Sequence, residues 1–415
     1  MPTSNPTTAA PASPTVAVKA SRRLAALRPY AFAEVDRLVQ KLKAEGAVPI
    51  DFGVGDPTVP TPELVRAATR RGVDAHATAG YPSYVGGAAF RSAVAAWMGK
   101  RFGVDLDPAT EITSSIGSKE IIFNLHEGFV DPGDVVIVPS PGYPPYSRGT
   151  LFAEGTPWFY PIEARNGFLP DLASFPESVV SRAKLMWICY PNSPTGAVAP
   201  KSFFRDVVAF CRDRGILLLS DEAYSEIWFG DEPPHSALEF SRDGVASVFS
   251  MSKRSAMTGY RIGWIAGDRR IVDVVKKVKT NIDSGTPNFV QDGAVAALSD
   301  EAHVAAFREE YRRKCSVLVR AMVDAGLDDC TPASTLYVWQ RVPRGWDSIA
   351  FAKRLLMKDV AIVATPGAWI SDPLADGRNP GDEFVRFALV PSIEETEEAA
   401  RRLRRIDFRR ERPPE

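Results

Sequence analysis

Apolar residues along this chain form short continuous runs rather than a strict alternation with polar residues. Runs at residues 134–140, 183–190 and 215–223 are each bounded by glycine, proline or charged residues. Continuous runs of this length are typical of strands that are buried on both faces of a parallel sheet. Helical patterns such as residues 88–102 and 201–215 lie between them. The sequence therefore predicts an α/β fold with a mainly parallel sheet covered by helices.

The pattern changes near residue 296, where a long charged helix is predicted over residues 300–326. A strand, a helix, a second strand and a closing helix are predicted after it, at residues 334–342, 348–359, 384–390 and 393–406. This second set of elements indicates a smaller α/β domain. We expect five segments in all: a disordered tail over 1–20, an N-terminal segment of the small domain over 21–64, a large domain over 65–295, the small domain over 296–408 and a charged tail over 409–415.

Composition excludes several classes of protein. The 415 residues are 45% hydrophobic and 24% charged, with a formal net charge of −1, so no nucleic acid or anionic membrane partner is expected. Four widely spaced cysteines and four histidines do not form a zinc motif, and we expect no metal. The sequence contains neither an apolar run of membrane-spanning length nor a secretory signal, which favours the cytoplasm.

One lysine stands out by its neighbours. Lys253 lies in the segment SMSKRSAMTGYRIG, with Ser250 three residues before it and Arg261 eight residues after it. A lysine is ordinarily a solvated surface residue, and we expect this of almost every other lysine in the chain. Amine chemistry on a carbonyl needs a lysine whose pKa is lowered by burial and nearby positive charge. Hydroxyl groups and an arginine close by are suited to holding a phosphate.

This segment resembles the cofactor-attachment motif of the fold-type I aminotransferases, classes I and II. The resemblance implies that Lys253 links to pyridoxal 5′-phosphate as a Schiff base. It also implies that Ser250 and Arg261 hold the cofactor phosphate. A fold-type I enzyme has a large domain with a mainly parallel seven-stranded sheet and a smaller α/β domain, in agreement with the predicted elements.

An acidic residue ends the third apolar run. Asp221 follows LLLS and precedes Glu-Ala-Tyr, and a carboxylate in such a place is costly unless it is paired. In the family that it resembles, Asp221 would pair with the protonated ring nitrogen and make the ring an electron sink. Tyr224 would hydrogen-bond the phenolic oxygen of the cofactor. The alternative interpretation is an N-cap aspartate and a core tyrosine.

The segment CYPNSPTGAV reads as a tight turn with a candidate cis peptide bond before Pro194. The family has an asparagine immediately before this proline, in contact with the phenolic oxygen. Here Ser193 takes that place, 28 residues before Asp221 as in the family, and Asn192 lies one position earlier. The sequence leaves open which of Asn192 and Ser193 contacts the cofactor.

Two further segments match the cofactor site of the family. In SSIGSKEIIF a strand is followed by a turn and a helix start, where main-chain N–H groups can bind an anion. By resemblance Gly117, Ser118 and Lys119 would cradle the phosphate. Tyr143, in PSPGYPPY, would stack on the cofactor ring. Each of these two motifs is weak when it is taken alone.

Three more residues are implied by the resemblance. Arg386, in FVRFALV, would bind the substrate α-carboxylate, for which the guanidinium fork is well suited. Gly55, in FGVGDP, would bring its main chain close to the same carboxylate. Tyr81, in GYPSYVGG, would reach across the interface of a homodimer with shared active sites to the partner's phosphate.

The resemblance extends from about Ser21 to Phe408. Phrases such as LRPYAFAEVDRL, SPGYPPY and STLYVW are similar to the branch of LL-diaminopimelate and succinyl-diaminopimelate aminotransferases. In that branch Tyr30, Lys119 and Asn281 would lie near the substrate side chain. The branch commonly has a glutamate near the YPSY segment, which this chain lacks, and Trp369 with Ile370 replaces Phe-Gly. A substrate like diaminopimelate and another amino acid both remain open.

The predicted activity is a ping-pong transamination. An amino acid would give its amino group to the cofactor and leave as a 2-oxo acid, and a second 2-oxo acid would take the group up. Lys253 would move the proton from the substrate Cα as general base and acid. Alternatives are a pyridoxal-phosphate-dependent lyase, cyclase or oxidase, a specialised-pathway aminotransferase, and a regulator with an added DNA-binding module. For that module the segment before Ser21 is too short.

Overall fold

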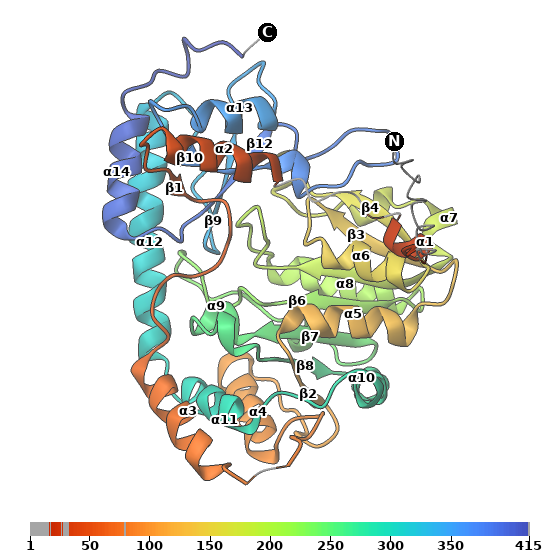
Figure 1. Cartoon of the computed structure of the whole chain (residues 1–415). Coiled ribbons are helices and arrows are strands. Elements are labelled where there is room, and N and C mark those ends of the chain that lie inside the picture. Colours follow the sequence, from red (N-terminus) through yellow and green to blue (C-terminus); the bar gives the residue numbers. More distant parts are fainter. Residues whose placement is uncertain (1–15, 17, 26, 28–32, 79, 414–415) are drawn as a thin grey trace, which may run out of the picture.

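The computed structural model describes residues 16–413, apart from 17, 26, 28–32 and 79. The chain forms a larger layer around the central sheet of Figure 1 and a smaller layer above it. Most of the tail predicted over residues 1–20 lies outside the described residues. Tyr30, which the sequence places near the substrate, lies outside them as well.

A seven-stranded sheet forms the centre of the larger layer, in the order β2-β8-β7-β6-β5-β3-β4. Only β8 runs antiparallel to its neighbours. The strands are β2 (Ile112–Ser115), β3 (Val135–Ser140), β4 (Thr156–Pro161), β5 (Ala183–Cys189), β6 (Leu217–Asp221), β7 (Val245–Ser250) and β8 (Gly263–Gly267). The three apolar runs of the sequence form β3, β5 and β6, which confirms the predicted α/β fold with a mainly parallel seven-stranded sheet.

Helices cover both faces of this sheet. Along β5, Met186 packs into one hydrophobic cluster and Leu185 and Trp187 pack into the other, so both faces of the strand are buried. The helices of this layer are α3 (Glu63–Ala75), α4 (Ala88–Phe102), α5 (Ser118–Phe129), α6 (Pro145–Phe152), α7 (Glu177–Val180), α8 (Lys201–Arg212), α9 (Met251–Arg254), α10 (Arg269–Ile282) and α11 (Asn288–Leu298). No helix in the described part of the chain combines the length and the apolar character needed to cross a membrane.

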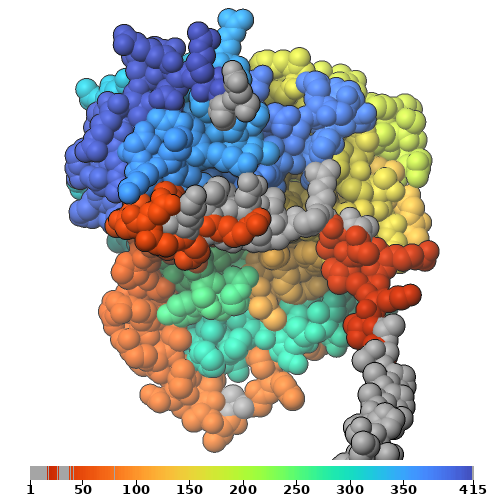
Figure 2. Space-filling view, turned by 45° about the horizontal axis from the view of Figure 1, so that its top comes forward, coloured from red at the N-terminus to blue at the C-terminus, as the bar shows by residue number. Residues whose placement is uncertain are grey.

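The smaller layer joins both ends of the chain. Ile50 and Phe52 pack into the same cluster as the C-terminal helices, so the N-terminal segment belongs to this core. In Figure 2 the orange-red helix α2 (Ala33–Ala44) lies along the lower edge of the blue C-terminal layer. The other helices of this layer are α12 (Ala302–Asp324), α13 (Ser348–Leu355) and α14 (Ile393–Leu403). The short helix α1 (Arg22–Ala25) instead lies against α6 of the larger layer, where Arg23 donates to the Phe152 carbonyl at 3.0 Å. The strands are β1 (Ile50–Asp51) paired with β10 (Ile362–Val363), and β11 (Thr365–Pro366), β12 (Phe384–Ala388) and β9 (Tyr337–Arg341) in one antiparallel sheet.

The carboxyl ends of the parallel strands face the smaller layer, and this is where open α/β sheets bind their ligands. Asp221 is the last residue of β6, and Lys253 lies on α9, which begins directly after β7. From the smaller layer, Tyr337 begins β9 and Arg386 lies in the middle of β12. The fold therefore brings residues from both layers to one place.

Candidate active site

A cavity of about 340 Å³ lies where the ends of β6 and β7 meet β9 and β12. Most of the predicted site residues line it: Gly55, Ser118, Lys119, Tyr143, Ser193, Asp221, Tyr224, Ser250, Lys253, Arg261 and Arg386. Three residues that the sequence did not single out, Tyr146, Cys189 and Tyr337, line it too. The cavity is large enough for a small ligand and mixes aromatic walls with a few polar groups, as ligand sites usually do.

Lys253 extends into this cavity from the short helix α9. The Ser250 hydroxyl caps the helix by accepting a hydrogen bond from the main-chain N–H of Ser252 at 3.2 Å. The Lys253 amine donates to the carbonyl oxygen of Gly55. Among the described residues no carboxylate lies within ion-pair distance of it. Burial lowers the pKa of Lys253 and outweighs Tyr337 and Asp56, which raise it. The positive charges of Arg386 and Arg261 lower it further.

Asp221 is buried at the bottom of the cavity with a side chain that accepts two hydrogen bonds. The Tyr146 hydroxyl donates to Oδ2 at 2.7 Å, and the main-chain N–H of Ala223 donates to Oδ1 at 3.1 Å. Burial raises the pKa of Asp221, while both hydrogen bonds lower it. Within the described part of the chain no cation is paired with this carboxylate. A positively charged group of a ligand would supply the missing charge.

Two tyrosines of the PSPGYPPY segment flank this carboxylate. Tyr143 is partly exposed at the cavity, and burial together with the nearby Asp221 raises its pKa to about 12. Tyr146 is buried and stacks on Trp187, with ring centroids 4.8 Å apart and planes inclined by 16°. The sequence prediction singled out Tyr143 and missed Tyr146. Tyr146 is the second tyrosine of the PSPGYPPY segment, so the sequence offered it as a candidate. Its hydrogen-bond partner Asp221 lies 75 residues away, and the sequence alone does not show that contact.

The start of α5 and the loop before β8 form an anion-binding end of the cavity. Ser118 is the first residue of α5, where main-chain N–H groups point outward. Gly117 has a positive φ of 72°, and a Cβ at this position would overlap the guanidinium of Arg261. Arg261 also has a positive φ, 55°, and donates to the carbonyl oxygen of Ile116 at 3.4 Å. Gly117 does not line the cavity itself, and its lack of a side chain leaves room for the Arg261 guanidinium.

Tyr224 and Arg386 are connected through Tyr337. The Tyr224 and Tyr337 hydroxyl oxygens lie 3.0 Å apart, and the Arg386 guanidinium lies 4.6 Å from the Tyr337 ring centroid. Nη2 of Arg386 donates to the carbonyl oxygen of Gly53 at 2.8 Å. Its Nε is buried without a hydrogen-bond partner. A buried unused donor of this kind is available to a carboxylate ligand.

The turn before Pro194 separates Asn192 from Ser193. Asn192 is buried, and its amide bonds within the turn: Nδ2 donates to the Cys189 carbonyl at 3.1 Å, and Oδ1 accepts from the Thr195 hydroxyl at 2.8 Å. The peptide bond before Pro194 is cis, as the turn predicts. Of the two candidates, Ser193 lines the cavity and Asn192 does not.

Other predicted residues do not reach the cavity within one chain. The side chain of Tyr81 is 91% exposed. Asn281 is exposed on α10, where its amide donates to the Lys277 carbonyl at 2.9 Å. The structure therefore does not bring these two residues together with Lys253 in a single chain.

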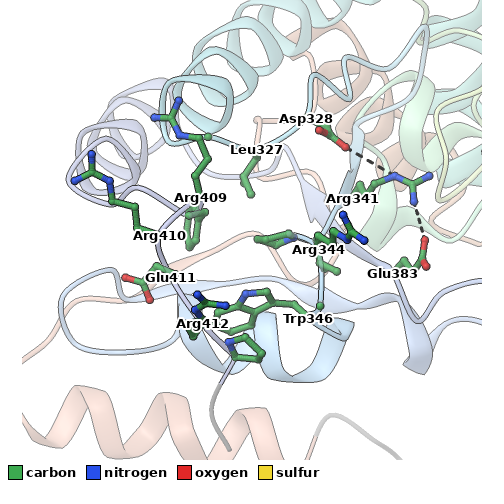
Figure 3. Close-up of a pocket in the computed structure, with 16 residues that line it drawn as sticks. Leu327, Asp328, Arg341, Arg344, Trp346, Glu383, Arg409, Arg410, Glu411 and Arg412 are labelled. Carbon is green, nitrogen blue, oxygen red and sulfur yellow. Dashed lines mark hydrogen bonds and ion pairs between the residues drawn. The ribbon is translucent and has the colours of Figure 1, made fainter.

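A larger cavity, of about 1160 Å³, lies in the smaller layer and is drawn in Figure 3. Several arginines line it, but Arg341 is paired there with Glu383 at 2.7 Å and with Asp328 at 3.9 Å. No residue of the predicted cofactor site reaches it. Size alone therefore does not identify the reactive site, and the combination of buried amine, buried carboxylate and unused guanidinium does.

The chain belongs to the aminotransferases of class I and II, because residues 47–403 match that family. It is similar to the LL-diaminopimelate aminotransferases of Aquifex aeolicus and Desulforudis audaxviator. The first is 41% identical over 93% of this chain and 98% of the relative, and the second is 43% identical over 92% and 97%. The solved structure of substrate-bound BacF from Bacillus subtilis superposes with a TM-score of 0.87, at 29% identity over 94% of this chain and 98% of that chain.

The protein is therefore an aminotransferase with the fold-type I architecture, and enzymes of this family use pyridoxal 5′-phosphate. The cavity fits this cofactor. Among the described residues it offers an amine with no carboxylate within ion-pair distance at Lys253, a buried carboxylate with no paired cation at Asp221, and an arginine beside a helix start at Arg261. These are the groups that a carbonyl, a protonated ring nitrogen and a phosphate require.

Proposed function

We propose that Lys253 carries pyridoxal 5′-phosphate and that the enzyme moves an amino group from an amino acid to a 2-oxo acid by a ping-pong mechanism. The observation that carries this proposal is the environment of Lys253. Among the described residues its amine bonds only to a main-chain carbonyl, in a cavity that is also lined by the buried carboxylate of Asp221 and by Arg386 with its unused donor.

Each side chain then has a role that follows from its charge and position. Arg261, Ser118, Lys119 and Ser250 hold the phosphate at the start of α5. Asp221 keeps the ring nitrogen protonated, because a buried carboxylate stabilises a cation strongly. These groups hold the cofactor at the bottom of the cavity.

Other side chains orient the reacting end. Tyr224 and Ser193 face the phenolic oxygen, and Tyr143 covers the ring from the mouth of the cavity. Arg386 binds the substrate carboxylate through the donors left free at its guanidinium, beside the main chain of Gly55. A fork of this kind orients the substrate as well as binding it.

When it is bound, pyridoxal 5′-phosphate supplies an electron-withdrawing ring that stabilises negative charge at the substrate Cα. Once the amino group of the substrate has displaced it from the cofactor, the Lys253 amine would take up the proton of the substrate Cα and give it back as general base and acid. A lysine can do so near neutral pH only if its pKa is lowered, and burial together with two neighbouring cations lowers the pKa of Lys253.

We propose a long amino acid with a second polar end, such as LL-diaminopimelate, as amino donor. The names of the relatives from Aquifex and Desulforudis support this substrate class. Lys119, which the resemblance places near the substrate side chain, lines the same cavity as Arg386. The segment at residues 81–86 contains no acidic residue, so the distal amine would need a different partner from the glutamate of the diaminopimelate branch.

A single-turnover screen of amino donors tests this proposal. The purified enzyme is mixed with LL-diaminopimelate, glutamate, lysine or phenylalanine, without an oxo acid, and the visible absorbance of the bound cofactor is followed. LL-diaminopimelate should convert the cofactor fastest and leave it as pyridoxamine phosphate. Conversion only by glutamate or an aromatic amino acid would reject the substrate, whereas a lack of conversion by every donor would reject transamination.

We also propose that two chains form a homodimer in which Tyr81 completes the phosphate site of the partner. The side chain of Tyr81 is almost fully exposed, and the loop that carries it packs on residues 283–285, where a Cβ at Gly285 would overlap the Ser83 carbonyl oxygen. A loop that is held firmly while its aromatic tip remains in solvent is suited to contact a partner.

Mixing two inactive variants tests the shared site. Lys253→Ala removes the proposed attachment lysine of the active site, and Tyr81→Ala removes the side chain that is proposed to reach the partner's phosphate site. If Tyr81 acts across the interface, a mixed dimer contains one intact site, and refolding the two variants together restores activity. If Tyr81 acts within its own chain, no mixture recovers activity beyond the sum of the two variants.

We propose the cytoplasm as the compartment. All four cysteines are free thiols, and Cys189, Cys211 and Cys315 are buried. This pattern suits a reducing environment, where thiols stay unpaired. Fractionation of the producing cells, with the enzyme followed by its activity, tests this assignment.

A further inference from the structure

Tyr337 lines the cavity, although no role was predicted for it from the STLYVW segment that contains it. It is the first residue of β9, its ring is buried, and its hydroxyl lies 3.0 Å from that of Tyr224. Its ring supports the guanidinium of Arg386, whose Cζ lies 4.6 Å from the ring centroid. One side chain from the smaller layer thus touches both the proposed carboxylate site and the proposed cofactor contact.

The same hydroxyl also lies beside the proposed catalytic lysine. A Cβ at Gly55 would overlap the Tyr337 hydroxyl oxygen, so only glycine leaves room for the phenol there. The carbonyl oxygen of Gly55 accepts the hydrogen bond of the Lys253 amine. The Tyr337 hydroxyl and the Lys253 amine therefore both lie next to Gly55, and both side chains line the same cavity.

The charges around Tyr337 differ from those around the other buried tyrosines. Burial raises the pKa of Tyr337, but the positive charges of Arg386 and Lys253 and hydrogen bonds with Tyr224 and Ser193 outweigh it and lower the pKa below its ordinary value. The pKa of Tyr224 is instead raised, because burial is not offset by cations to the same extent. Tyr337 is the member of this pair that faces the cations, so it is the one that gains anionic character.

We propose that Tyr337 is a positioning residue for the transamination, whose hydroxyl holds the Lys253 amine and the Tyr224 hydroxyl in place while its ring supports Arg386. The proposal rests on the proposed role of Lys253. It assigns two separable functions to one side chain. The hydroxyl oxygen positions the Lys253 nitrogen, and the ring supports Arg386, which is proposed to bind the substrate carboxylate.

The variant Tyr337→Phe separates these functions, because it removes the oxygen and keeps the ring. In the holoenzyme, the pH midpoint of the cofactor's visible absorbance should fall by about half a unit or more, since the nitrogen at Lys253 loses a neighbour that favours its protonated form. The rate constant of the amino-donor half-reaction should fall about tenfold, while the apparent dissociation constant of the donor stays within about threefold. Tyr337→Leu, which also removes the ring, should weaken donor binding as well.

Tyr190→Phe is the matched control. Tyr190 is buried in the larger layer and donates to the Phe168 carbonyl at 2.6 Å, outside the cavity. Its loss should lower the thermal midpoint without moving the pH midpoint or the half-reaction constants. If folded Tyr337→Phe keeps its pH midpoint within about a tenth of a unit and its half-reaction rate within about twofold of the wild type, the proposal is wrong.

A measurement on the wild-type holoenzyme keeps the proposal testable if Tyr337→Phe does not fold. The ultraviolet absorbance of phenolate should show one tyrosine that ionises at lower pH than the rest, and a carboxylate ligand such as propionate should raise its midpoint by neutralising Arg386. A titration with no early component would overturn the proposal. If the wild type instead shows no pH-dependent visible band, or Lys253→Ala retains it, the assignment of Lys253 fails and not that of Tyr337.

Discussion

Two lysines of the larger layer, the half-buried Lys253 and the fully buried Lys279, have different electrostatic surroundings. The Nζ of Lys279 lies 3.0 Å from Oε1 of Glu120 and 2.9 Å from Oδ2 of Asp283, and its side chain is fully buried. The Lys253 amine bonds to a main-chain carbonyl and, among the described residues, has no carboxylate within ion-pair distance. The first lysine is neutralised by its neighbours, and the second is not.

This difference distinguishes a structural lysine from a reactive one. A buried cation that is fully paired stays charged and holds its partners together. The pKa of Lys253 is lowered mainly by burial, to which the charges of Arg386 and Arg261 add, and the opposite effects of Tyr337 and Asp56 do not cancel this lowering. Burial alone therefore does not identify a reactive lysine, and the absence of an anionic partner in the described structure does.

Replacing the reactive lysine should have the largest effect. In Lys253→Ala, turnover should fall by at least about a thousandfold, because the variant loses both the attachment point and the proton-transferring amine. Steady-state transamination and the visible spectrum measure this loss. An enzyme that keeps its spectrum and its turnover would place the chemistry elsewhere.

Replacing the paired lysine should change stability instead. Lys279→Met leaves Glu120 and Asp283 buried without their cation, and the free energy of unfolding should fall by about 3 kcal/mol. Denaturant unfolding measures this change, and turnover per folded molecule should remain within about twofold because the lysine does not line the cavity. A stable variant that has lost its activity would contradict the division between the two lysines.

Replacing Arg386 by lysine changes the shape of a cation in the cavity and keeps its charge. Arg386→Lys should lower kcat/KM for the amino donor by about 2 kcal/mol, roughly thirtyfold, because an ammonium cannot reproduce the guanidinium fork. The loss should appear mainly in KM, as measured at saturating oxo acid. If only kcat changes, Arg386 does not bind the ground-state carboxylate.

The smallest effect concerns the cofactor-free protein. The pKa of Lys253 is lower in the fold than the ordinary lysine value, so the unfolded chain binds more protons between these two values and stability rises as the pH increases through that window. Lys253→Met should remove this slope and stabilise the cofactor-free fold by about 1 kcal/mol at neutral pH. Thermal midpoints measured across alkaline pH test it, and an equal slope in both proteins would argue against a lowered pKa.

The sequence predicted what local patterns determine. The apolar runs gave β3, β5 and β6 because a strand buried on both faces has no polar positions. Asp221 was singled out because it ends such a run, and Lys253 because hydroxylic residues and an arginine lie close to it in the sequence; both side chains line the cavity.

Contacts between distant segments were not predictable. Tyr337 lies 113 residues from Tyr224, and nothing around it in the sequence indicates a charged cavity. The choice between Asn192 and Ser193 depended on the direction of two adjacent side chains in a tight turn. Lys279 and Lys314 are exceptions to the expectation that almost every other lysine is a surface residue. Each has an acidic partner one helical turn away, Asp283 and Glu310, and only the Glu120 partner of Lys279 is distant in the sequence.

The most direct test of the account is to locate the cofactor on the protein. The purified holoenzyme is treated with borohydride, which makes the carbon–nitrogen bond between cofactor and lysine permanent, and its peptides are analysed by mass spectrometry. We predict the added pyridoxyl phosphate mass on the peptide that contains Lys253, and on that lysine alone. The same mass on Lys119 or Lys279, or on no lysine, would contradict the account.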